Sequence, residues 1–170
     1  MDKNLFPIAI PVKPYIKKFI EVEYGVPTII TRRDIIGNKL YDVLHRRYTG
    51  EKIYHKNYST EITLHISKNL FRYAGAGLKL PGIIAFNSFM KLLIKDKQRT
   101  FINTYVQSNR CQIQEAIMAF IDQYQSDGDD FNLEVIKKDY YRWRLHEPRN
   151  IFPTNVPSVF HTKKMTHAIN

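Results

Sequence analysis

The stretch "IIAFNSFMKLLIKDKQRTFINTYVQ", residues 83–107, decides the fold class of this 170-residue chain. Apolar side chains recur in it every three or four residues, which is the period of an amphipathic α-helix. The residues that would share one face of such a helix are Phe86, Phe89, Met90, Leu93, Phe101 and Tyr105. The spacing predicts one long helix over residues 82–107, with its lysines and Arg99 on the other faces.

Two further segments with helical period follow this stretch. "IQEAIMAFIDQYQ" (113–125) places apolar residues at i, i+3, i+4, i+7, i+8 and i+11, the most regular helical pattern of the chain. "LEVIKKDYYRWR" (133–144) follows an acidic turn, and Asn132 before it suits a helix N-cap. On this last helix an arc of about 80° would pack inward, and it holds Leu133, Ile136, Tyr140 and Trp143.

Helices are also predicted in the N-terminal part of the chain. Pro14 suits the first turn of a helix and Gly25 suits its C-terminal end, so we expect a helix between them. A second helix is predicted over residues 32–48, where Thr31 and Asp34 form a near capping box.

A single segment, "STEITLHIS" (59–67), changes from the helical period to strict alternation of apolar and polar residues. This pattern is typical of a half-buried strand, which needs a partner. The candidate partners are the short runs 51–55 and 69–73, so we expect a small antiparallel β element around residues 51–73.

Prolines divide both ends of the chain from its middle. Prolines at 7, 11 and 14 disfavour a helix, so residues 1–13 are predicted to form an extended N-terminal arm. Prolines at 148, 153 and 157 predict an extended C-terminal arm over residues 148–170, whose apolar residues would lie on the domain or on a neighbour. Between the arms, residues 14–147 form one domain. The expected class is mainly α with a small antiparallel β element (α+β), a helical bundle with two extended arms.

The charge of the chain restricts its partners. It has 26 Lys and Arg against 16 Asp and Glu, a net charge of +10. Such a surface favours polyanions, so nucleic acid, an acidic membrane face or an acidic protein could be bound, although basic proteins without an anionic partner have similar compositions. Cys111 is the single cysteine, which excludes an internal disulfide and a cysteine zinc cluster. Because no run approaches roughly 20 apolar residues, we expect no membrane partner.

The basic residues gather on two predicted helices. Cations there would contact phosphate oxygens and guanine edges, and an interleaved tyrosine would contact a sugar or a base. The candidate nucleic-acid contacts are Arg32, Arg33, Lys137, Lys138, Tyr141, Arg142 and Arg144. The competing interpretation is an ordinary charged face that meets solvent or another protein. The turn at 126–132 is also longer than that of a tight helix-turn-helix.

Patterns typical of catalysis or of metal binding are missing from the sequence. The six histidines include no i, i+4 pair and have no flanking cysteines. Gly75 and Gly77 are followed by Leu80, where a dinucleotide fingerprint needs a third glycine. The pair Tyr140 and Tyr141 lacks an accompanying metal cluster. We therefore expect a non-catalytic protein with no cofactor and no metal.

The C-terminal helical segments resemble a known group of proteins. "IIAFNSFMKLLIKDKQRTFINTYV", "IQEAIMAFIDQYQ" and "LEVIKKDYYRWR" together are similar to the helical block of small basic proteins, mostly uncharacterised, from phages and mobile elements of gut bacteria. The ending "IKKDYYRWR" is the most specific part. The resemblance covers residues 81–145, under half of the chain, and implies a helical, phage-related protein for which DNA binding and a virion role are both reasonable.

Two hypotheses follow from the sequence. In the first, the chain is a non-catalytic phage or mobile-element protein of the host cytoplasm that binds nucleic acid, expected to be DNA, through its basic amphipathic helices. In the second, it is a structural subunit of a virion, in a neck, tail or connector assembly, and its extended arms clasp neighbouring subunits.

Overall fold

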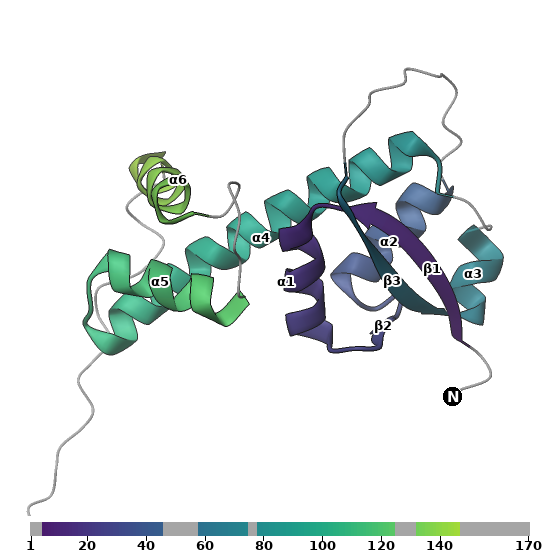
Figure 1. The fold of residues 1–170 in the computed structure, drawn as a ribbon, viewed down its shortest axis with the longest axis horizontal. Coiled ribbons are helices and arrows are strands. Elements are labelled where there is room, and N and C mark those ends of the chain that lie inside the picture. Colours follow the sequence, from purple (N-terminus) through teal and green to yellow (C-terminus); the bar gives the residue numbers. More distant parts are fainter. Residues whose placement is uncertain (1–4, 46–57, 75–77, 125–131, 147–170) are drawn as a thin grey trace, which may run out of the picture.

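The computed structural model describes residues 5–45, 58–74, 78–124 and 132–146 (Figure 1). In chain order they form β1 (Leu5–Val12), α1 (Pro14–Tyr24), β2 (Thr28–Ile30), α2 (Ile35–His45), β3 (Thr60–Ser67), α3 (Lys68–Ala74), α4 (Leu80–Asn109), α5 (Ile113–Tyr124) and α6 (Leu133–His146). The expected class, mainly helical with a small β element, is confirmed. The expected C-terminal arm, 148–170, lies outside the described residues.

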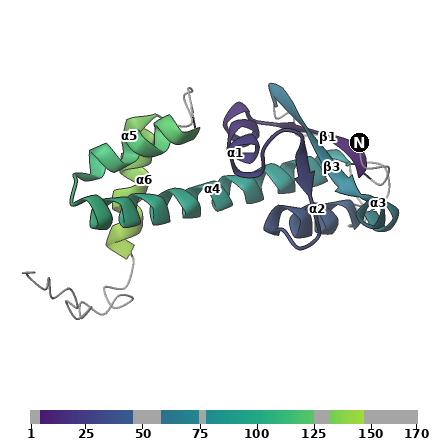
Figure 2. The same cartoon turned by 90° about the horizontal axis from the view of Figure 1, so that it is seen from below.

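The longest helix, α4, organises the molecule. Its 30 residues would span about 45 Å at 1.5 Å per residue. It contacts β1, α1 and α2 near its start and α5 near its end. Figure 2 shows α5 running back along α4 while α6 crosses it. Within the described ranges, no helix combines the length and the apolar character needed to cross a bilayer.

The three strands form a mixed sheet in the order β1-β3-β2. β1 runs antiparallel to β3, with Ile10 opposite Ile62, whereas β2 runs parallel to β3. One face of the sheet is buried under helices, through Ile10, Val12, Ile30, Ile62, Leu64 and Ile66. The opposite face exposes polar and small residues such as Ala9, Glu61 and Thr63. The helices thus cover the sheet on one side only, so the core that the sheet shares with them lies on that side.

The N-terminal residues were predicted to form an extended arm outside the domain, and the described ones belong to the domain. Residues 5–12 are extended, but they form β1 and pair with β3 along their whole length. Pro7 and Pro11 are tolerated because β1 is an edge strand, so only one of its sides needs backbone donors. Burial of Ile10 and Val12 makes this segment part of the core.

One of the two predicted partners of β3 was wrong. The run 69–73 belongs to α3, which begins directly after β3, and Ser67 Oγ accepts a hydrogen bond from Leu70 N at 3.4 Å. The other predicted partner, 51–55, lies outside the described residues. Because β2 pairs in parallel, the β element is mixed and not purely antiparallel.

The N-terminal helices follow the sequence signals closely. Pro14 opens α1, and Gly25 follows its end with a φ of 76°. Helix α2 begins at Ile35 and not at residue 32, because Asp34 Oδ2 accepts hydrogen bonds from the backbone N (2.7 Å) and hydroxyl (2.8 Å) of Thr31 and closes a turn there. The predicted last residues of this helix, 46–48, lie outside the described part.

The predicted C-terminal helices are confirmed, with a shift in the buried face of α4. Helix α4 is a few residues longer than predicted at both ends. Phe86 and Met90 are buried as expected, but Ile94 and Ile102 replace the predicted Leu93 and Phe101 as the most buried residues of its later turns. The latter two still pack against the core from its edge.

An aromatic cluster joins α1, α4 and α5. The Phe19 ring stacks on Tyr124 with centroids 5.1 Å apart, and Phe120 contacts both Tyr124 (4.6 Å) and Phe101 (5.4 Å). At its edge, the Tyr124 hydroxyl donates a hydrogen bond of 2.6 Å to Glu23 on α1. This cluster fixes the sheet-bearing half of the molecule against its helical half.

Glu23 is held as a carboxylate at this junction. Burial alone would raise the pKa of its carboxyl, but hydrogen bonds from Lys97 and Tyr124 outweigh burial and lower that pKa below its usual value. Burial and the bond to Glu23 in turn raise the pKa of the Tyr124 hydroxyl. Lys97 of α4, whose side chain is 48% exposed, is therefore paired with a carboxylate at this junction.

Candidate nucleic-acid interface

Helix α6 presents the face that the sequence predicted. Asn132 caps it, because its Oδ1 accepts a hydrogen bond from Val135 N at 2.9 Å. The inward arc is confirmed: Ile136 and Tyr140 are buried, and Leu133 and Trp143 pack against the core. The remaining residues of α6 are consequently turned away from the core or lie on its flanks.

The outer face of α6 consists of Lys138, Tyr141, Arg142 and Leu145. Lys138 and Arg142 are exposed and stand one helical turn apart, about 6 Å along the axis. The Tyr141 side chain between them is 43% exposed. Neither cation makes an ion pair or a hydrogen bond with another residue in the described ranges. Both charges thus face outward without an acidic neighbour bound to them.

The other two predicted cations of α6 lie beside this outer face. Lys137 is half-buried on the flank, and Arg144 is exposed in the last turn. A cation in the last turn is stabilised by the helix dipole, so part of the role of Arg144 is structural. Glu134 in the first turn is similarly favourable to the dipole, and it places one negative charge at the start of the helix.

On its other flank α6 is tied to α4 through a carboxylate that the sequence analysis missed. Asp139 Oδ2 accepts hydrogen bonds from Arg99 Nη2 at 2.8 Å and from Arg99 Nε at 3.2 Å, and its Oδ1 accepts one from Lys95 Nζ. Burial alone would raise the pKa of the Asp139 carboxyl, but these bonds and charges lower it below its usual value. The guanidinium of Arg99 also lies 5.7 Å from the centroid of the Trp143 ring.

The Asp139 contact sorts the cations of the helical half into two groups. Lys95 and Arg99 neutralise a carboxylate between α4 and α6, whereas Lys138 and Arg142 point away from it. The signal available in the sequence was Asp139 itself, a carboxylate in the middle of the basic segment 133–144. Its partners could not be identified without the packing of the two helices.

Arg32 and Arg33 lie in the turn before α2 and not on the helix face where they were predicted. Both are exposed, and the guanidinium of Arg32 stands 4.2 Å from the centroid of the Tyr41 ring. In both ribbon views α2 lies near the start of α4, whereas α6 lies near its end (Figures 1 and 2). The structure therefore does not bring these two arginines together with the α6 cations.

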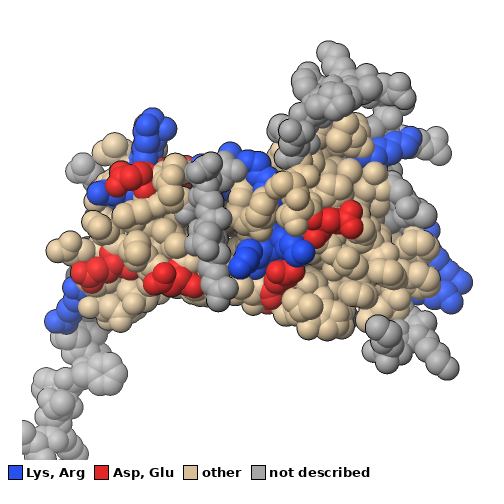
Figure 3. All heavy atoms as spheres, in the orientation of Figure 1, with Lys and Arg blue, Asp and Glu red and all other residues tan. Residues whose placement is uncertain are grey.

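The visible charge of the molecule is mixed. On the face drawn in Figure 3, Lys and Arg side chains occur at both ends and near the middle, with Asp and Glu among them. Several described cations pair with acids, as in Lys39–Asp42 (3.4 Å) and Lys97–Glu23. The net charge alone therefore does not mark a binding face, and the pairing state of each cation matters more.

Metal ligands do not converge in the part of the chain that the structure describes, where no three His, Cys, Asp or Glu side chains are placed to hold an ion.

Comparison of the chain with protein-family models, with curated proteins and with solved structures found no match.

Proposed function

We propose that the protein binds nucleic acid through the outer face of α6. The observation that carries the proposal is the pair Lys138 and Arg142, exposed on one face, one turn apart and with Tyr141 between them. Cations at this spacing suit successive phosphates, and an exposed ring suits a sugar or base contact. The high net charge of the chain supports a polyanion as the partner.

DNA is the expected form of nucleic acid, in line with the phage-related context that the C-terminal resemblance implies. Lys137 and Arg144 would extend the contact along the strand from the flank of the helix. Four cations that displace counterions would give a slope of log K against log salt of about −3 to −4. Arg32 and Arg33, at the other end of the molecule, remain a separate predicted contact.

Charge reversal on α6 tests the proposal. The double variant Lys138→Glu/Arg142→Glu should weaken binding of a fluorescent DNA duplex at low salt by about tenfold or more, because two attractive contacts become repulsive. The matched control is Lys18→Glu/Lys68→Glu, which changes the net charge equally at exposed positions of α1 and α3. Equal losses in both variants would indicate only a general field effect, and an unchanged affinity in the α6 variant would refute the proposed site.

A second candidate function is contact with another protein subunit, as in the virion hypothesis. The observation that favours it is Leu145, which is 82% exposed on the outer face of α6 close to Tyr141. An exposed apolar side chain of this size suits a protein partner better than a phosphate. Light scattering of the purified chain, with Leu145→Ser alongside, tests it: an assembly that this substitution dissolves would favour subunit contact over DNA binding.

A further inference from the structure

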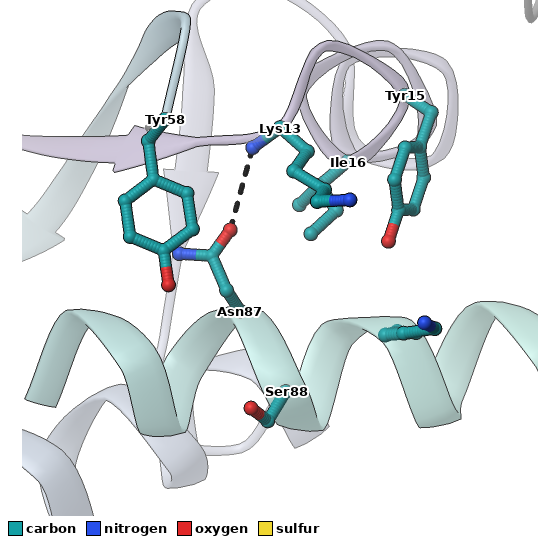
Figure 4. Close-up of a pocket in the computed structure, with 7 residues that line it drawn as sticks. Lys13, Tyr15, Ile16, Tyr58, Asn87 and Ser88 are labelled. Atoms are coloured by element: carbon teal, nitrogen blue, oxygen red, sulfur yellow. Dashed lines mark hydrogen bonds between the residues drawn. The ribbon is translucent and has the colours of Figure 1, made fainter. Parts of the chain in front are cut away.

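A cavity of about 280 Å³ lies between the β1–α1 junction and α4, away from the outer face of α6 (Figure 4). Tyr15 and Tyr58 stand on opposite sides of it, and both hydroxyl groups point toward α4. Asn87 and Ser88 of α4 line its floor, and the Lys13 side chain lies between the two rings. Two aromatic walls and a polar floor are the usual parts of a small-molecule site.

The floor of the cavity is held in place by Asn87, which is buried. Its Oδ1 accepts a hydrogen bond from Lys13 N at 3.3 Å, and its Nδ2 donates to the carbonyls of Pro11 (3.0 Å) and Ile83 (2.9 Å). The amide thus ties the β1–α1 junction to α4, and its oxygen is already used. The floor of the cavity is therefore already formed without a ligand.

A smaller cavity of about 100 Å³ adjoins the first, since Tyr15 and Lys91 line both. It adds Lys95, Gln98 and Asp139. Gln98 is only 3% exposed, and its Nε2 has no hydrogen-bond partner within the described ranges. The carboxylate of Asp139 is already bound by Lys95 and Arg99, and it is not paired with Lys91, the other cation of this lining.

Each of the two cavities is lined by a residue with a buried hydrogen-bond donor that lacks a partner within the described ranges. The buried hydroxyl of Tyr58, like Nε2 of Gln98, lacks a partner among the residues that the structure describes. Burial raises the pKa of the Tyr58 hydroxyl, so it is a protonated donor near neutral pH. Lys13 and Lys91 add positive charge at the larger cavity. Unpartnered buried donors beside cations favour a ligand with several acceptor oxygens and negative charge.

We propose that this cavity binds a nucleoside monophosphate, with its phosphate held by Lys13, Lys91 and the Tyr58 hydroxyl and its base against the Tyr15 ring. A volume of about 280 Å³ suits a small ligand and not a folded polymer. A phosphate supplies the acceptors that the lining lacks, and a flat base suits tyrosine faces. The site is distinct from the outer face of α6 and does not depend on nucleic-acid binding there.

Calorimetric titration of the full chain with AMP, adenosine, ribose 5-phosphate and inorganic phosphate tests the proposal. AMP should bind with a submillimolar Kd and at least about tenfold more tightly than each of the other three probes, because only AMP uses both the cations and the Tyr15 ring. AMP binding no tighter than inorganic phosphate or ribose 5-phosphate would overturn the assignment of the base.

Two conservative variants locate the site. Lys91→Gln keeps a helix-forming residue at an exposed position, and Tyr58→Phe removes only the hydroxyl, so both should fold, which circular dichroism can verify. Each should weaken AMP binding by about tenfold. The matched control, Lys138→Gln on α6, should leave AMP affinity unchanged. Folded Lys91→Gln and Tyr58→Phe proteins with wild-type AMP affinity would overturn the proposal, whatever the α6 variants do to DNA binding.

Discussion

The contact of Asp139 with Lys95 and Arg99 provides the sharpest test of the packing between α4 and α6. Asp139→Asn keeps the size of the side chain and removes its charge, so Lys95 and Arg99 lose the carboxylate that they share. The Asp139 side chain is 21% exposed, whereas those of Lys95 and Arg99 are 34% and 25% exposed. The contact is therefore intermediate between a surface ion pair and a buried one.

The burial sets the expected magnitude. Exposed pairs contribute up to about 1 kcal/mol, and breaking a buried pair costs roughly 3–5 kcal/mol. With intermediate burial and two cations released, Asp139→Asn should lower the free energy of unfolding by about 2 kcal/mol. For a chain of this length that corresponds to a loss of about 4–8 °C in Tm.

The dependence on pH distinguishes lost charge from disturbed packing. Because the pKa of Asp139 is lowered in the folded protein, its stabilisation is present above the unfolded pKa, near 3.9, and is lost as the pH falls through the folded value. The difference between wild type and Asp139→Asn should therefore vanish in strong acid.

Urea unfolding at neutral and acid pH measures this difference in unfolding free energy. The fluorescence of Trp143, the single tryptophan, reports the unfolding, and this residue lies beside Arg99. Asp122→Asn, an exposed position on α5, is the matched control and should change stability by less than about 0.5 kcal/mol. A neutral-pH difference no larger than that of the control would refute the reasoning. A difference that persists undiminished in acid would assign the effect to packing and not to charge.

Two further predictions concern the N-terminal half and its junction with α5. Gly37→Ala should cost about 3 kcal/mol or more, because a Cβ there would lie 1.8 Å from the Thr31 carbonyl oxygen. Gly25→Ala has open space around it and is opposed only by a backbone conformation (φ 76°, ψ 179°) that other residues avoid, so it should cost about 1–3 kcal/mol in the same thermal melts. A loss for Gly37→Ala no larger than that for Gly25→Ala would contradict the close-contact argument. Tyr124→Phe should cost about 1–2 kcal/mol through the lost bond to the Glu23 carboxylate. Unchanged stability in urea would show that this bond contributes nothing.

Periodicity predicted the described helices except α3, whose residues 69–73 were expected to form a strand. The apolar residues of α5 and α6 recur at positions that only a helix brings to one face, and Ile136 and Tyr140 are buried as their spacing required. The caps at Pro14 and Asn132 are local features, set by residues within one turn, so they too could be predicted from neighbours in sequence.

Features that depend on distant residues could not be predicted in this way. One partner of β3 is β1, and the prolines at 7 and 11, which an edge strand tolerates, concealed the alternation of β1. Arg32 lies on a turn because the Asp34 side chain bonds to the backbone of Thr31, and this turn stands where the first turn of the helix was predicted. The contact of Asp139 with Lys95 and Arg99 forms only because α6 packs across α4, and the periodicity of the sequence does not predict how two helices cross.

The unbroken length of α4 has a consequence for how the chain can change. Asn87 bonds the β1–α1 junction on one turn of α4, and Lys95 and Arg99 hold α6 on later turns. One residue inserted between positions 88 and 94 would rotate everything beyond it by about 100° and advance it by about 1.5 Å. The two attachments could then no longer be satisfied together. Substitutions along this helix can therefore preserve both attachments, whereas an insertion or a deletion between them cannot.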